Sequence, residues 1–281
     1  MNSSIQCHTS IPVRLGDVTS SKLSDILNSS VKKWGVLLPV GSLEQHGPLL
    51  PLNCDTAIAG RAAENLARAL TDNHQYGAFV LPDFAYTPSP GTEDTSGTVS
   101  VSFDWMGLGL KEIIAGTMKT PWSFVVIVNS HAHNHGRVIE AAMAGSEGSL
   151  GRKVPVVVIN LYEYIHLARE LGLDPGSHAG EFELALYHYY EGYIPPQDIA
   201  LEMNPLRKRP PFVYGLNILP RSHQGIISPH LPVISRALSQ ADALGKVLDK
   251  EILECLITSL DVYFTEWVDP CLLYTSDAAD E

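Results

Sequence analysis

Residues 124–136 read FVVIVNSHAHNHG, an apolar segment that leads directly into a cluster of histidines. The segment Phe124–Asn129 is almost continuously apolar, which is typical of a strand buried on both faces of a parallel sheet. Three other segments have the same character, namely Trp34–Val40, Ala78–Pro82 and Val154–Asn160. We therefore predict a mainly parallel sheet built from these four strands.

Helical patterns lie between and after the predicted strands. In Thr56–Leu70, apolar residues recur along one stripe of a helix. Strands that alternate with helices form βαβ units, so we predict an α/β protein, a three-layer α/β/α sandwich. The other predicted helices are Phe103–Met118, Arg137–Glu147, Glu181–Tyr190 and about Leu231–Leu260.

The length of 281 residues suits one large domain or two small ones. The irregular stretches Thr87–Gly97 and Pro205–Pro220 do not separate two cores, so we expect one domain over residues 1–270. The segment Cys271–Glu281 resembles a translated sequencing adapter and follows the helix-breaking pair Asp269-Pro270. We expect a non-native tail there and exclude it from the argument.

Composition limits the possible partners and compartments. The net charge is −12, which argues against nucleic acid and anionic membranes as partners. Four cysteines are too few for a disulfide scaffold. The N-terminal region contains no apolar core of a signal peptide, and no apolar run approaches the roughly 20 residues of a membrane helix. A cytoplasmic protein is the expectation.

The first polar cluster follows the first predicted strand, where ligands of parallel sheets bind. Glu44 and His46 are two residues apart, so in an extended segment both side chains point to one side. A carboxylate and an imidazole together can hold a divalent metal, although a solvated loop is an equal alternative. Asp55 precedes the next helix, and taken alone it is better explained as an N-cap.

Two more clusters contain histidines. His131, His133 and His135 follow the strand Phe124–Asn129, and packing does not explain three histidines there, so we predict a metal site. His135 can equally be polar surface. In the third cluster, His178 suits general acid–base chemistry, Glu181 suits a helix start, and Glu183 can point into the pocket. One shared site is the economical interpretation.

These motifs resemble those of the creatininase (creatinine amidohydrolase) family. The resemblance rests on Leu43-Glu-Gln-His-Gly-Pro with Asp55, on Asn129-x-His131, and on His178-Ala-Gly-x-x-Glu183. Ser96–Ser100 and Gly225–Pro229 match family loops more loosely. The match runs in the right order from about Trp34 to Leu260. It implies an α/β/α sandwich, two divalent metals, a small-molecule substrate and commonly a hexamer.

The resemblance also implies roles for individual residues. His178 matches the histidine assigned to proton transfer, and Asp55 matches a ligand that bridges the metals. The metal ligands implied are Glu44, His46, Asp55, His131, His133 and Glu183, with the last two as alternatives for the final position.

The sequence also departs from the family pattern. Ser130 replaces a glycine, and His133 stands where creatininase has a glutamate ligand. A less negative site favours zinc or another nitrogen-tolerant ion, so the expected metals are Zn, Mn or Fe. Tyr162 and Asp174 stand where tryptophans shape the creatinine pocket, so creatinine is not the expected substrate. Trp105 lies near the Ser96–Ser100 loop and can line a pocket of this or a neighbouring subunit, although core packing is the favoured expectation.

The function expected from this resemblance is hydrolysis of a cyclic amide or a formamide. A metal-activated water would attack the carbonyl, and His178 would donate a proton to the leaving nitrogen. Two alternatives stay open. One is another metal-dependent ring-opening hydrolase, and the other is a metal-binding oligomer subunit without catalysis.

Overall fold

Strand β1 (Lys33–Val40) lies inside a four-stranded sheet in the computed structural model, which describes residues 11–73, 75–146, 154–174, 178–196 and 231–267. The strand order is β2-β1-β3-β4, and every pair is parallel. The other strands are β2 (Tyr76–Val80), β3 (Phe124–Asn129) and β4 (Val156–Asn160). The predicted parallel sheet is confirmed, because strands this apolar exclude water from both of their faces.

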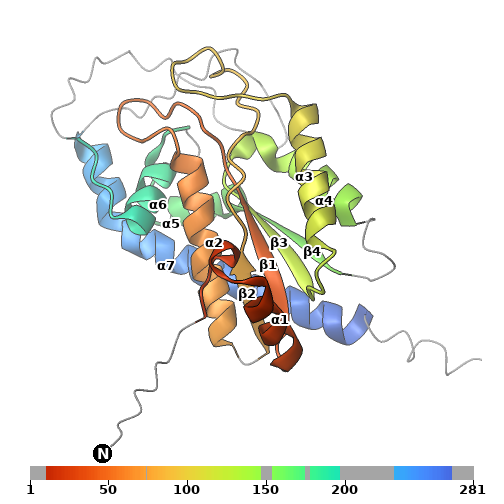
Figure 1. Cartoon of the computed structure of the whole chain (residues 1–281). Helices are drawn as coiled ribbons and strands as arrows, with labels where there is room; N and C mark the ends of the chain where they lie inside the picture. Colours follow the sequence, from red (N-terminus) through yellow and green to blue (C-terminus); the bar gives the residue numbers. More distant parts are fainter. Residues whose placement is uncertain (1–10, 74, 147–153, 175–177, 197–230, 268–281) are drawn as a thin grey trace, which may run out of the picture.

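Helices cover both faces of the sheet and complete the predicted three layers (Figure 1). Leu37 of β1 packs into the core on one face, and Val36 and Leu38 pack into the core on the other. The first face is covered by α2 (Cys54–Asp72), α5 (Ile165–Glu170), α6 (Glu181–Glu191) and α7 (Leu231–Val262). The second is covered by α1 (Ser20–Ser29), α3 (Phe103–Thr117) and α4 (His135–Ser146).

Short helical turns complete the described elements. They are η1 (Leu15–Asp17), η2 (Ala132–Asn134), η3 (Leu161–Tyr164) and the π-helical turn η4 (Tyr263–Trp267). Helix α1 was not predicted, although Leu23, Ile26 and Leu27 form a short apolar stripe that packs on the core. Pro205–Pro220, Gly225–Pro229 and Cys271–Glu281 lie outside the described residues. Within the described parts of the chain, no helix is long and apolar enough to cross a membrane.

Gly41 brings the end of β1 against the start of α2. A Cβ atom at Gly41 would lie 2.4 Å from both the backbone nitrogen and the Cα of Thr56. The Thr56 hydroxyl donates a hydrogen bond of 2.8 Å to the carbonyl oxygen of Ser42, which holds the two segments together. This close approach fixes the residue before Thr56, Asp55, beside the loop that follows β1.

A buried carboxylate anchors the outer face of α2. Glu64 accepts hydrogen bonds from Arg14 at 2.6 Å, Arg68 at 3.2 Å and Arg61 at 3.3 Å. Burial by itself raises the pKa of Glu64, but the hydrogen bond and charge of Arg14 and the charges of the other two arginines hold this pKa below its ordinary value.

We expect Glu64 to contribute stability that depends on pH. Because its folded-state pKa is lowered, the contribution is present above the unfolded pKa of about 4.3 and is lost as the pH falls through the folded value. The arginines are partly exposed, so solvent screening limits the contribution to about 1 kcal/mol. Urea unfolding of wild type and Glu64→Gln at pH 7 and pH 3 measures it. The gap should be smaller at pH 3 than at pH 7, and an equal gap at the two pH values contradicts the assignment. Glu140→Gln, an exposed Arg137 partner, is the control.

Candidate metal centre

The predicted polar residues meet where the carboxyl ends of the strands lead into long loops (Figure 1). Glu44 and His46 follow β1, and His131 follows β3. Asp55 and Glu183 lie in the first turns of α2 and α6. All five are at least 97% inaccessible to solvent. So many buried polar groups need partners, because a charge without one is strongly unfavourable in a protein interior.

These side chains form two compact groups of potential metal ligands. Glu44, Asp55 and His131 make one group, and His46, His178 and Glu183 make the other. Within each group the ligand atoms lie within 4.8 Å of one another. Carboxylate oxygens and imidazole nitrogens at this spacing suit divalent ions such as zinc or manganese.

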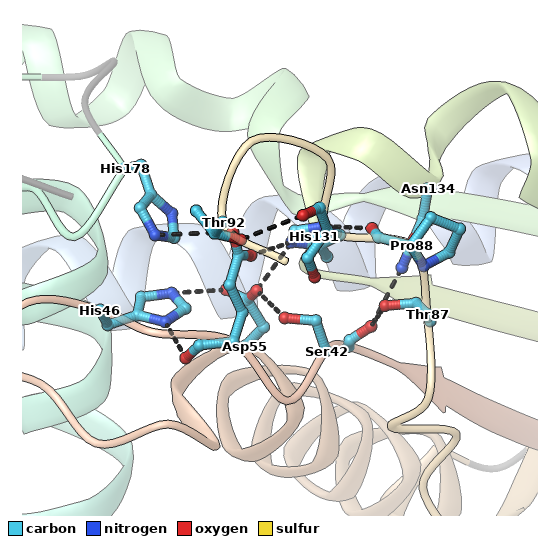
Figure 2. A network of polar contacts seen from close by, with 12 residues as sticks. Ser42, His46, Asp55, Thr87, Pro88, Thr92, His131, Asn134 and His178 are labelled. Atoms are coloured by element: carbon cyan, nitrogen blue, oxygen red, sulfur yellow. Dashed lines mark hydrogen bonds and ion pairs between the residues drawn. The ribbon is translucent and has the colours of Figure 1, made fainter. Parts of the chain in front are cut away.

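Asp55 lies between the two groups (Figure 2). Its Oδ2 atom is 2.8 Å from Nδ1 of His131, and its Oδ1 atom is 3.3 Å from Nε2 of His46. The Ser42 hydroxyl donates to Oδ2 at 2.7 Å and so fixes the carboxylate. The residue before Asp55, Cys54, already belongs to α2, and Asn53 is the N-cap. The N-cap assignment for Asp55 is therefore wrong, because the helix begins earlier than predicted and turns this side chain inwards.

Backbone carbonyl groups set the tautomers of both histidines. Nε2 of His131 donates to the carbonyl oxygen of Pro88 at 3.0 Å, and Nδ1 of His46 donates to that of Glu44 at 2.9 Å. A carbonyl oxygen only accepts, so the other ring nitrogen of each neutral histidine carries a lone pair. Those lone pairs face carboxylate oxygens. Metal-binding histidines are oriented in this way by their second nitrogen.

The surroundings of two carboxylate oxygens show whether a cation fits between the ligands. Oε2 of Glu44 and Oε2 of Glu183 are buried and accept no hydrogen bond from the described residues. The first lies 3.2 Å from Nδ1 of His131, and the second lies 3.9 Å from Nε2 of His46. Lone pairs facing each other across these gaps need a proton or a cation between them, so this donor set fits divalent metal.

The pKa values of His46 and Asp55 reflect the same demand for positive charge. Burial disfavours a charged His46, yet the charge and hydrogen bond of Asp55 raise the pKa of His46 to about 10. Burial alone would raise the pKa of Asp55, but His46 and His131 hold it well below its ordinary range. A second proton on a histidine would balance the carboxylates, and a bound metal ion would take over that role.

His178 reaches the site from the segment before α6. Its Nε2 donates to the carbonyl oxygen of Gln45 at 2.7 Å, and its ring centroid lies 4.4 Å from that of His46. The next residue, Ala179, has φ of 54°, a strained conformation for a residue with a Cβ atom. The side chain of His178 is 16% exposed, so it contacts both the ligand groups and the solvent side.

Several predicted residues lie outside the two groups. His133 is partly buried, and its ring centroid is 5.2 Å from that of His131. His135 is exposed and lies 3.6 Å from Glu163, as polar surface residues do. Glu181, at the first position of α6, pairs with Arg236 at 2.6 Å. Trp105 is 50% exposed and stacks on Phe84, so the expectation of core packing for it is wrong.

Three side chains hold the ligands in a way that the sequence did not predict, although the family resemblance had already placed Tyr162 at the position of a pocket tryptophan. Ser42 bonds Asp55, as described above. The Thr92 hydroxyl donates to Oε1 of Glu44 at 2.6 Å, and the Tyr162 hydroxyl donates to Oε1 of Glu183. Thr92 comes from the predicted irregular stretch Thr87–Gly97. Hydroxyl residues are common in loops, so no local pattern marks them.

Comparison with solved structures supports the fold. A structure titled "Creatininase Mn" matches with a TM-score of 0.70 and 19% sequence identity, over 89% of this chain and 99% of that one. A structure of a mutant creatininase of "Zn-Zn type" matches with a TM-score of 0.66 and 18% identity, over the same shares of the two chains. Identity this low carries the fold and nothing more specific.

Sequence comparison identifies the family. A protein named mycofactocin precursor peptide peptidase, from Mycolicibacterium smegmatis, is 32% identical over 204 residues, which are 72% of each chain. One of the same name from Mycobacterium ulcerans is 36% identical over 140 residues, 48% of this chain and 52% of its own. The family model described as creatinine amidohydrolase matches residues 19–229. Since that match spans most of the sequence, the chain belongs to the creatininase family.

Proposed function

We propose that this protein is a metal-dependent hydrolase that cleaves an amide C–N bond. The observation that carries the proposal is the pair of ligand groups, with Asp55 between them and one unpartnered carboxylate oxygen in each. Glu44, Asp55 and His131 would hold one divalent ion, and His46, Asp55 and Glu183 would hold a second. Zinc, manganese and iron all accept such mixed nitrogen and oxygen ligands.

The residues of the site have separate tasks in this reaction. When bound, a divalent ion supplies an acidic water as nucleophile and polarises the carbonyl oxygen of the substrate. The hydrogen bonds from Ser42 and Thr92 keep the carboxylates of Asp55 and Glu44 in place, so the site is organised before substrate arrives. His178 is the partly exposed imidazole next to the ligands, and it would pass a proton to the leaving nitrogen.

A peptide bond is the substrate bond that we favour. The relatives from Mycolicibacterium and Mycobacterium are named as peptidases of a precursor peptide, and the alignment with the first covers 72% of both chains. A cyclic amide or formamide is the second candidate, because the matching family model is described as creatinine amidohydrolase. Hydrolysis of short peptides, lactams and formamides by the metal-loaded protein separates the two. Full metal occupancy without turnover of any of them favours the metal-binding subunit without catalysis.

His131→Ala is expected to remove at least one metal equivalent and to abolish hydrolysis. The variant lacks the nitrogen that faces both Asp55 and Glu44. Elemental analysis of the purified proteins measures the metal content directly. His166→Ala, at an exposed histidine near Glu251, is the control and should keep its metal. Absence of divalent metal from the wild type, or undiminished metal in His131→Ala, refutes the site assignment.

Three other expectations stay predictions. His133 lies outside both groups, and loss of metal from His133→Ala would place it among the ligands. A hexamer is the assembly expected from the family resemblance, and sedimentation velocity tests it. A cytoplasmic location is tested by fractionation of the source cells.

A further inference from the structure

The two glutamates of the site are held by the same device, although they come from distant segments. In each case a hydroxyl group donates to Oε1, from Thr92 to Glu44 and from Tyr162 to Glu183. In each case Oε2 is buried and accepts no hydrogen bond from the residues that the structure describes. Each free oxygen faces a histidine nitrogen, as given above.

The hydroxyl fixes where the free oxygen points. A carboxylate is planar, so anchoring one oxygen leaves the second only a narrow range of positions. A carboxylate carries no proton, so the tyrosine must be the donor in its contact with Glu183. Tyr162 itself is held in place, because it lies in η3 directly after β4 and its ring packs 5.8 Å from that of Phe182.

We propose that Tyr162 is the positioning residue that aims Oε2 of Glu183 at the second ion, and that Thr92 does the same for Glu44 at the first. This inference rests on the proposed metal-dependent function and adds a division of labour to it. Each hydroxyl serves one ion, since each one contacts the ligand of one group. Neither hydroxyl is itself a ligand.

Metal titration tests the proposal without reference to turnover. Co²⁺ is added to the metal-free wild type and followed by calorimetry and visible absorption, which give the affinity and coordination of each ion. Tyr162→Phe should lower the affinity for one ion by about 10- to 100-fold, because this is the usual effect of losing a residue that holds a metal ligand. The visible absorption of that bound Co²⁺ should change as well. Thr92→Val should lower the affinity for the other ion by a similar factor.

Two comparisons assign these losses to the glutamates. The ion weakened in Tyr162→Phe should be the one lost in Glu183→Ala, and adding Tyr162→Phe to Glu183→Ala should cause no further loss. Such non-additivity is expected when one residue acts through the other. Tyr190→Phe is the matched control, because its hydroxyl also donates to a carboxylate, Asp249 at 2.7 Å, but away from the site. It should bind both ions as the wild type does.

Each other result overturns the proposal. Unchanged affinity and absorption in Tyr162→Phe, an equal loss of both ions, or the same loss in Tyr190→Phe would each do so. If Tyr162→Phe does not fold on its own, the double variant is compared with Glu183→Ala. A further loss of metal affinity in the double variant then overturns the proposal. A wild type that binds no Co²⁺ refutes the proposed function itself. If the wild type and Tyr162→Phe both bind two ions with the same affinity, only this inference is refuted and the proposed function stands.

Discussion

Asp55→Asn is expected to abolish binding of both metal ions, and hydrolysis with it. The change replaces one carboxylate oxygen by an amide nitrogen, which cannot be a ligand. Asp55 is the one acidic residue that contacts both His46, at 3.3 Å, and His131, at 2.8 Å, among the described residues. Since loss of an outer-shell partner already costs up to about 100-fold in affinity, loss of this shared ligand should cost more.

Equilibrium dialysis followed by elemental analysis measures the effect of Asp55→Asn. The fold should persist, because the amide keeps the shape of the side chain and removes a buried negative charge. Asp104→Asn is the control, since Asp104 also lies in the first turn of a helix but is exposed and pairs with Arg137. Retention of two tightly bound ions by Asp55→Asn would show that Asp55 is not shared between them.

Gly41→Ala is expected to damage both stability and metal binding, although it adds a single methyl group. The new Cβ would lie 2.4 Å from backbone atoms of Thr56, so the start of α2 must move. Overpacking of this kind typically costs about 1–3 kcal/mol of unfolding free energy, and backbone cannot yield as a side chain does. The movement carries Asp55 away from His131, so metal affinity should fall as well.

Urea unfolding in the presence and absence of a chelator separates the two effects of Gly41→Ala. With chelator, the loss of unfolding free energy reports the steric clash alone. The additional loss without chelator reports weakened metal binding. Gly116→Ala in α3 is the matched control, because a Cβ atom added there would meet nothing within 4 Å. This variant should lose neither stability nor metal affinity. Wild-type stability in Gly41→Ala would contradict the close approach.

The main features of the fold could be read from the sequence because burial on both faces leaves a strong local signal. Phe124–Asn129 is apolar up to its last residue and was predicted with the bounds that the structure has. Helix α2 begins at Cys54, two positions before the predicted Thr56, because helix starts depend on contacts that no local pattern contains. The same small difference changed Asp55 from a cap into a residue that contacts His46 and His131.

The site was partly predictable for a related reason. Ligands at strand ends are marked by residue type, and Glu44 and His46 both lie in candidate ligand groups, although in different ones. His133 is in neither candidate group, and it lies in η2 (Ala132–Asn134), where the chain is no longer extended. The contacts of Thr92 with Glu44 and of Tyr162 with Glu183 could not be predicted, since they arise only when distant segments of the chain meet.

The spacing of the ligands along the chain has a consequence for folding. Asp55 and His131 are 76 positions apart, and Gln45 and His178, which also meet, are 133 apart. Closing such long loops is slow and entropically unfavourable, so these contacts form late. By mass action, free metal at 100 times its dissociation constant would add about 2.7 kcal/mol to the native state. The melting temperature should therefore rise with the concentration of free metal. In this respect the ion acts as a reversible crosslink between segments that are far apart in the sequence.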